Sequence, residues 1–331
     1  MQAALPYLSE SEAQGIAEQA RTLIRAVESV ILGKSETVRL ITIGLLSGGH
    51  LLVEDIPGVG KTTLARAVAK AIGGQFRRIQ FTPDLLPGDV TGSIIYNQAR
   101  GAFEFHPGPI FANIVLADEI NRATPKTQSA LLEAMEERTV SIEGESHPLP
   151  QPFLVIATQN NIEMVGTYPL PEAQMDRFFA RAALGYPSPE VEARILESRQ
   201  LGAPLETLQP VMTPEQLLEL QRQTRRVYIS PAVRRYLVDV VNATRHHPKV
   251  MLGASPRASI ALMLGAQAHA LLSNRYYVTP DDVQQTAIPV LAHRLMMRSD
   301  ASGSVRAETV IREILSQIPV PIGGDAPNAR I

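Results

Sequence analysis

The feature that most constrains this chain is a glycine-bearing turn at residues 54–63, with the sequence EDIPGVGKTT. The apolar run His50-Leu51-Leu52-Val53 before it predicts a buried strand, and residues 63–69 after it predict the start of a helix. A turn in this context directs backbone N–H groups to the N-terminus of the helix, where the helix dipole favours phosphate. We therefore predict a phosphate-binding loop rather than an ordinary Gly/Pro turn.

The predicted nucleotide-binding residues run without a gap along this loop: Asp55, Ile56, Pro57, Gly58, Val59, Gly60, Lys61, Thr62 and Thr63. Lys61 is expected to reach the β- and γ-phosphates of ATP, and the Thr62 hydroxyl to bind Mg²⁺. Asp55 stands where the strict pattern has glycine. Because a carboxylate close to phosphates is unfavourable, we expect the Asp55 side chain to point outward.

Composition narrows the class of protein. A chain of 331 residues can bury a sizeable core and form two domains, and a balance of 31 basic against 33 acidic residues argues against coating a nucleic acid or a membrane. There is no cysteine, so disulfides and thiolate metal sites are excluded. No signal-peptide pattern or apolar run of spanning length is present, and we expect a soluble, cytoplasmic protein with no membrane insertion.

The order of apolar patterns predicts an α/β core followed by helices. Helices are expected over 12–29 and 37–46, strands over 76–81, 113–117 and 153–157, and a hairpin over 140–150. Residues 82–110 are rich in Gly and Pro and resemble an insertion with two short strands. Beyond a break at 186–189, helices are expected over 189–200, 213–227, 231–245, 255–273 and 280–298. We predict a mostly parallel sheet flanked by helices (1–186), a smaller all-helical domain (187–318) and a disordered tail (319–331).

Two further strands are followed by polar residues that suit the chemistry of ATP. Asp118 and Glu119 follow one strand, and Asn160 follows the next. Ligands of open α/β sheets bind at the carboxyl edge, so Asp118 is expected to hold Mg²⁺ through water and Glu119 to orient and deprotonate the attacking water. An amide at Asn160 can hold the same water or the γ-phosphate. Each signal alone is weak, and their combination with the phosphate loop carries the prediction.

At this point the chain resembles the MoxR family of AAA+ ATPases. The resemblance rests on long strings: DEINRA at 118–123 with PKTQSALLEAM at 125–135, ATQN at 157–160, GTYPLPEAQ at 166–174 with DRF at 176–178, and GASPRA at 253–258. Asn161 departs from the proline usual in the family. The resemblance covers residues from about 24 to 319 and implies an AAA+ P-loop NTPase core with a helical lid.

The resemblance also implies roles for particular residues. Asn160 is expected to be the first sensor, and Arg177 the arginine finger offered to the ATP of a neighbouring subunit, as arginine does in phosphoryl transfer. Arg257, near the start of a lid helix capped by Ser255, is expected to be the second sensor and to touch the γ-phosphate from the lid. Residues 82–109 correspond to the insertion in the second helix of this branch, and 139–152 to the hairpin before the sensor strand.

The function implied is an ATP-driven machine of the chaperone type. A homo-oligomeric ring, a hexamer, is expected to act on separate client proteins or on partners with a von Willebrand factor A domain. The alternatives are a nucleic-acid motor, a magnesium-chelatase-like ATPase subunit and a scaffold that binds ATP without turnover. The insertion is acidic, and the pairs Arg77-Arg78, Arg225-Arg226 and Arg234-Arg235 indicate solvated surface, so no nucleic-acid partner is expected.

Overall fold

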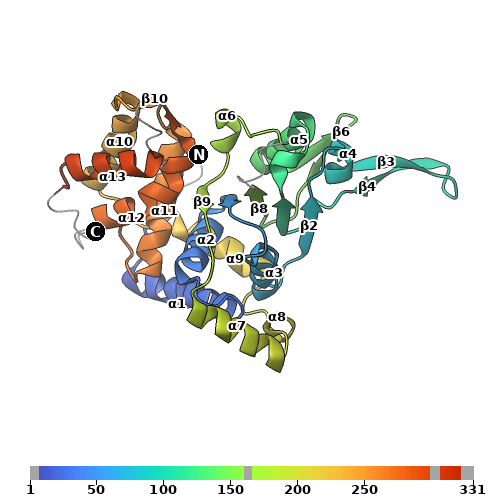
Figure 1. Cartoon of the computed structure of the whole chain (residues 1–331), viewed down its shortest axis with the longest axis horizontal. Helices are drawn as coiled ribbons and strands as arrows, with labels where there is room; N and C mark the ends of the chain where they lie inside the picture. The colour runs from blue at the N-terminus through green and yellow to red at the C-terminus, as the bar shows by residue number, and fades with distance from the viewer. Residues whose placement is uncertain (1–6, 160–165, 299–305, 322–331) are drawn as a thin grey trace.

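The computed structural model describes residues 7–159, 166–298 and 306–321, and a parallel sheet lies at its centre (Figure 1). Its five strands, in the spatial order β2-β5-β8-β1-β9, are all parallel. The bounds are β1 (Leu51–Glu54), β2 (Phe76–Gln80), β5 (Ile114–Asp118), β8 (Leu154–Gln159) and β9 (Ala180–Ala182). The predicted parallel sheet is confirmed. The edge strand β9 was not predicted, because three residues are too few for a hydrophobic pattern.

Each face of the sheet is covered by helices, because alternate strand residues point to opposite sides. Leu51 and Val53 pack in one apolar cluster with residues of α2 and α3, whereas Leu52 packs in a second cluster with residues of α5. The helices of the core are α1 (Glu10–Glu28), α2 (Ser35–Ser47), α3 (Lys61–Ala71) and α5 (Pro125–Glu137). A short 3₁₀ turn, η1 (Ile120–Arg122), precedes α5.

Two antiparallel hairpins extend from the core, one in the predicted insertion with two short strands and one where a hairpin was predicted. The first, β3 (Gly92–Asn97) with β4 (Ala102–Pro107), follows the short helix α4 (Pro87–Thr91) and projects away from the sheet (Figure 1). The second pairs β6 (Thr139–Ile142) with β7 (Glu145–Pro148). Glu143 and Gly144 form its two-residue turn with φ of 49° and 87°, the positive values that tight hairpin turns require.

The rest of the chain is mainly helical. After α6 (Glu172–Met175), the elements are α7 (Pro189–Leu201), α8 (Pro204–Thr207), α9 (Pro214–Thr224), α10 (Pro231–His246), β10 (Val250–Leu252), α11 (Pro256–Leu272), α12 (Pro280–Leu291), η2 (Ala292–Arg294), β11 (Met296–Met297) and α13 (Ala307–Gln317). The prediction of one helix over 280–298 was wrong. Helix α12 ends two residues after Pro289, which cannot supply a helical N–H, and the chain then turns into β11, which pairs with β10.

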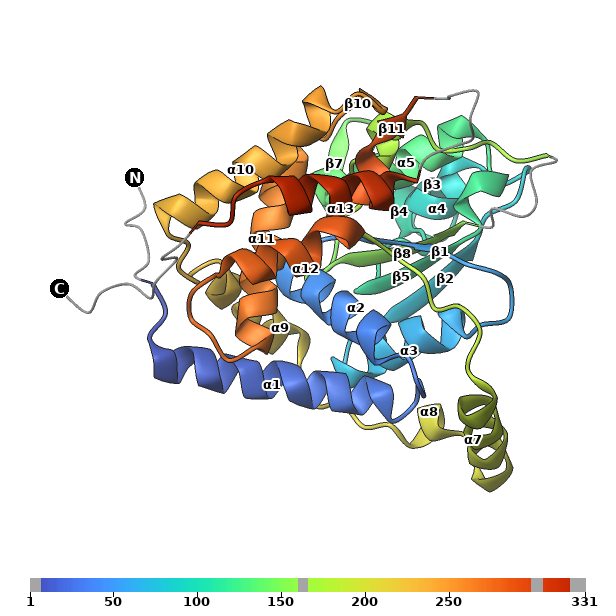
Figure 2. The same cartoon turned by 60° about the vertical axis from the view of Figure 1, so that its left-hand side comes forward.

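The C-terminal helices share their apolar interior with the core. Buried residues of α9, α10, α11 and α12 belong to the same cluster as those of α1, α2 and α3. Figure 2 shows α11 and α12 near α2, whereas α8 lies against the lower side of α3 and α7 projects beyond it. The domain limits at 186 and 318 stay a prediction, and most of the expected disordered tail lies outside the described residues. Within the described ranges, no helix combines the length and apolar character needed to cross a membrane.

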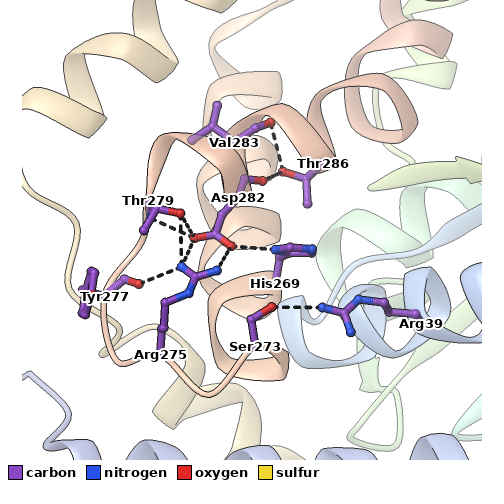
Figure 3. A network of polar contacts seen from close by, with 9 residues as sticks. All are labelled: Arg39, His269, Ser273, Arg275, Tyr277, Thr279, Asp282, Val283 and Thr286. Atoms are coloured by element: carbon purple, nitrogen blue, oxygen red, sulfur yellow. Dashed lines mark hydrogen bonds and ion pairs between the residues drawn. The ribbon is translucent and has the colours of Figure 1, made fainter. Parts of the chain in front are cut away.

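A buried ion cluster joins α11 to α12 (Figure 3). The Asp282 side chain is fully buried and accepts hydrogen bonds from Arg275 Nη2 (2.7 Å) and from the Thr279 N–H (2.8 Å), with His269 Nδ1 2.6 Å away. Burial opposes ionisation of this carboxyl, but the hydrogen bonds from Arg275, His269 and Thr279 outweigh burial and lower the pKa of Asp282 to about 2. On the neighbouring surface, Arg39 of α2 donates to the Ser273 hydroxyl at 3.1 Å.

Candidate functional site

The predicted phosphate loop connects β1 to α3 at the carboxyl edge of the sheet. Gly58 and Gly60 have φ of 84° and 98°, which residues with side chains rarely adopt, so the turn depends on both glycines. The first helical hydrogen bond of α3 runs from Leu64 N to Gly60 O, at 2.9 Å. The N–H groups of Lys61, Thr62 and Thr63 lie ahead of that bond, at the positive end of the helix dipole, where they suit an anion.

Asp55 is held by the backbone of the segment that follows β9. Its carboxylate accepts N–H groups from Leu184 and from Gly185, the latter at 2.8 Å, and from Ile56 at 2.9 Å. This geometry confirms the expectation that the carboxylate turns outward, to partners other than phosphate. Lys61 Nζ donates to the Asp55 carbonyl at 3.1 Å, so the lysine side chain folds back over its own loop.

The two predicted acidic residues follow β5 at the same edge. Thr158 of β8 donates its hydroxyl to Asp118 Oδ1 at 2.6 Å and accepts the N–H of Glu119 at 2.8 Å. Glu119 has φ of 56°, a left-handed value that is uncommon outside glycine and turns the chain sharply after the strand. Asp118 is buried, whereas a quarter of the Glu119 side chain is exposed, at 25%. The carboxylate and hydroxyl oxygens of Asp118 and Thr62 are hard ligands of the type Mg²⁺ prefers.

Residues on β2 that the sequence analysis did not select bind both carboxylates. Arg78 Nη2 lies 2.6 Å from Asp118 Oδ2, and Gln80 Nε2 donates to Glu119 Oε2 at 3.1 Å. Arg122 Nη1 donates to the same Glu119 oxygen at 3.0 Å. Arg78 is 48% exposed, in agreement with the interpretation of Arg77-Arg78 as solvated surface, and its ion pair with Asp118 was not predicted. The sequence did contain a signal for these two residues. Polar residues at the alternate positions 78 and 80 of a predicted strand lie on the same face of that strand.

A cavity of about 430 Å³ lies beside the phosphate loop. It is lined by the turn between α1 and α2, by the loop itself and by the segment that leads into α7; Ile31, Val59, Tyr186 and Ile195 are among its residues. Largely apolar walls next to a phosphate site suit the base of a nucleotide. Of these residues only those of the phosphate loop, such as Val59, were predicted, because the others come from separate segments that share no pattern.

The two predicted arginines lie together at the opposite edge of the sheet. Arg177 Nε is 3.2 Å from Glu136 Oε2, and Arg257 forms an ion pair with the other oxygen of the same carboxylate. The amino edge is identified by His50, which precedes β1 and has its Nε2 3.0 Å from the carbonyl of Met135, the neighbour of Glu136. Burial lowers the pKa of His50 to about 4, so the ring is neutral and donates to this carbonyl.

This placement separates both arginines from the phosphate loop of their own chain. The phosphate loop follows the end of β1, whereas Glu136 lies near the start of β1. The four residues of this strand, at about 3.3 Å each, separate the two by ~13 Å. Arg257 pairs with Glu136, beside Arg177, and the expectation that it touches the γ-phosphate from the lid stays a prediction. Asn160, the predicted first sensor, lies outside the described residues.

Comparison with known proteins identifies the family of this chain. Residues 50–180 match the family model for the ATPase family associated with various cellular activities (AAA), and residues 242–314 match an AAA lid domain. The Chaperone MoxR1 of Mycobacterium tuberculosis is 44% identical over 93% of this chain and 85% of that protein. The chain belongs to the MoxR family of AAA+ ATPases.

Other relatives are similar over nearly their whole length. Protein MoxR of Paracoccus denitrificans is 34% identical over 89% of this chain and 94% of that protein. The uncharacterized protein YeaC of Bacillus subtilis is 52% identical over 90% and 94%. A crystal structure of a candidate ATPase from Cytophaga hutchinsonii superimposes with a TM-score of 0.88 at 38% identity, covering 95% of this chain and 98% of that one. Membership of the MoxR family implies nucleotide binding and supports ATPase activity of the chaperone type.

Proposed function

We propose that this MoxR-family chain hydrolyses ATP at the interfaces between subunits of a closed ring, a hexamer, in the cytoplasm. The observation that carries the proposal is the position of Arg177 and Arg257 on Glu136, across the sheet from Lys61 and Asp118. One chain thus holds the two parts of a phosphoryl-transfer site at opposite edges. Head-to-tail contacts around a ring bring the arginines of one subunit to the phosphate loop of the next.

In the proposed reaction, each residue at the carboxyl edge has a separate task. Lys61 and the N–H groups at the start of α3 bind the phosphates. Thr62 and Asp118 would hold Mg²⁺, which would neutralise charge on the phosphates. Asp118 would hold the metal through water, and in this structure its partner is Arg78. Glu119 orients and deprotonates the attacking water, with Asn160 as the expected sensor.

The arginines from the neighbouring subunit complete the site. Arg177 stabilises the charge that develops on the transferred phosphoryl group, a role that arginine fills in trans in related chemistry. The Arg177 side chain is 30% exposed and borders a surface hollow of about 560 Å³, so a neighbour can reach it. Arg257 lies on α11 and reports the state of that nucleotide to its own lid. Glu136 releases both arginines when phosphate oxygens replace its carboxylate.

The client is proposed to be a separate protein, with a von Willebrand factor A domain as the expected partner. At the end of the β3–β4 hairpin, Tyr96 and Phe103 pack edge to face with ring centres 5.2 Å apart, and Phe103 is 74% exposed. Arg100 of the same hairpin forms an ion pair with Glu104 at 2.8 Å. An exposed aromatic pair beside a neutralised arginine supports protein contact over the gripping of a phosphate backbone.

The proposal is tested by mixing two inactive variants. Lys61→Ala keeps its arginines and Arg177→Ala keeps its phosphate loop, so each alone is expected to lack turnover. In a random equal mixture, about one interface in four pairs an intact loop with an intact Arg177, and about a quarter of wild-type activity should return. Arg312→Ala, an exposed arginine of α13, is the matched control and should hydrolyse ATP normally. Absence of rescue, when mass measurement shows mixed rings, would refute action in trans.

A further inference from the structure

The short segment that carries Arg177 is fastened to the lid by a buried guanidinium. Arg294, the last residue of η2, is 5% exposed. Its Nη2 donates to the carbonyls of Asp176 (3.2 Å) and Phe178 (2.6 Å), the residues on either side of Arg177. Its Nη1 donates to the Val290 carbonyl at 3.0 Å, and its Nε forms an ion pair with Asp176 Oδ1 at 3.0 Å. The segment is therefore held by backbone and side chain together.

The same aspartate connects this segment to the helix that carries Arg257. Asp176 Oδ2 accepts the Ser255 hydroxyl at 2.8 Å. Ser255 is the N-cap of α11 and accepts the Ala258 N–H at 3.3 Å. Through Asp176, the position of Arg294 therefore also determines the position of Ser255, which lies two residues before Arg257. Both arginines on Glu136 depend on one buried contact.

The chemistry of this contact requires arginine. A planar guanidinium can donate to two carbonyls and face a carboxylate at once, whereas an ammonium group is a single point donor. Burial lowers the pKa of Arg294 to about 10, with Asp176 opposing that effect, so the side chain is charged at neutral pH. A buried charge is unfavourable unless it is paired, and apolar packing alone could have filled the space.

We infer that Arg294 is a positioning residue, which presents Arg177 and Arg257 of its own subunit to the nucleotide bound by the next subunit. The inference rests on the proposed function in trans. On this inference, η2 couples neighbouring subunits. A movement of the lid shifts the carbonyls of Asp176 and Phe178, and Arg177 between them moves towards or away from the nucleotide of the next subunit. Lid position in one subunit thereby controls hydrolysis in another.

The test uses Arg294→Lys, which keeps the positive charge and removes the planar guanidinium that donates to several acceptors at once. Displacement of Arg177 by about 1 Å should lower kcat roughly 10²-fold. The Kd for ATP should stay within about twofold, because the variant's own loop and base cavity are intact. Arg312→Lys, an exposed arginine of the lid, is the matched control with unchanged kcat. Near-normal kcat in Arg294→Lys overturns the inference.

Mixing experiments separate a positioning role from a general effect on the lid. Arg294→Lys mixed with Lys61→Ala should recover about a quarter of wild-type activity, because Lys61→Ala supplies well-placed arginines. Mixed with Arg177→Ala it should recover nothing, since neither partner offers a positioned finger. If Lys61→Ala rescues Arg177→Ala but not Arg294→Lys, the inference is wrong and the proposed function stands. If Lys61→Ala rescues neither variant, the proposed function itself fails.

A second variant covers the case in which Arg294→Lys does not fold. Asp176→Asn keeps the shape of the side chain but loses the charge that faces Arg294 and the strong acceptor of Ser255. It should show the same pattern, with lowered kcat, ordinary ATP binding and rescue by Lys61→Ala only. A lowered affinity for ATP, with no rescue by Lys61→Ala, would assign Asp176 to its own nucleotide site and overturn the inference.

Discussion

Replacing Asp282 by asparagine tests whether an ionised carboxylate inside the lid stabilises this fold (Figure 3). The pKa of this carboxyl is about 2 in the folded chain against an ordinary 3.8. That difference, at about 1.4 kcal/mol for each pKa unit, corresponds to about 2 kcal/mol of stability. Because the folded pKa is the lower one, the unfolded chain binds the proton first as the pH falls. The stabilisation is complete above about pH 4 and is lost towards pH 2.

The variant should therefore lose at least about 2 kcal/mol of unfolding free energy at pH 7. The asparagine amide carries no charge for Arg275, and its NH₂ group faces donors in place of an acceptor. At pH 3 the gap between wild type and variant should be smaller by about 1 kcal/mol, because about half of the stabilisation that depends on ionisation is lost there. Asp281→Asn is the matched control: Asp281 is the exposed neighbour in the same first turn of α12, and its loss should cost less than about 1 kcal/mol.

The assay is urea unfolding followed by circular dichroism at pH 7, 5 and 3 for wild type, Asp282→Asn and Asp281→Asn. Hydrogen exchange across α11 and α12 locates the change, since amides near the broken cluster should lose protection first. An equal gap between wild type and Asp282→Asn at pH 7 and pH 3 would refute the reasoning, because the carboxyl would then contribute nothing through its ionisation. A difference in unfolding free energy near zero at pH 7 between wild type and Asp282→Asn would also refute it.

The remaining predictions concern turnover. Glu119→Gln should bind ATP normally but lose turnover roughly 10²-fold in steady-state assays, and near-normal turnover would remove Glu119 from the role of base. Asp55→Gly removes the acceptor for the Leu184 and Gly185 N–H groups and should raise KM for ATP several-fold, at about 1 kcal/mol for each hydrogen bond; an unchanged KM would contradict that link. ATPase activity should respond neither to DNA nor to moderate salt, whereas strong stimulation by DNA would favour a nucleic-acid motor.

Features encoded by neighbouring residues could be predicted from the sequence. The loop between β1 and α3 needs two glycines, a lysine and a threonine in one short stretch, and its flanking apolar runs specify strand and helix locally. The acidic pair at the end of β5 was found in the same way, since a continuous apolar run leads directly into Asp118. The hairpin around Gly144 was also local, because its turn needs positive φ.

The features that only the tertiary structure decided join distant parts of the chain. Arg78 meets Asp118 because β2 and β5 are neighbours in register, and the sequence has no signal for which strands lie side by side. The three-residue strand β9 exists only through its pairing with β1. Arg257 lies on Glu136 beside Arg177 because the start of α11 packs at the amino edge of the sheet. The local sequence pattern thus determined the phosphate loop. Packing between segments far apart in the sequence determined at which edge of the sheet Arg177 and Arg257 lie.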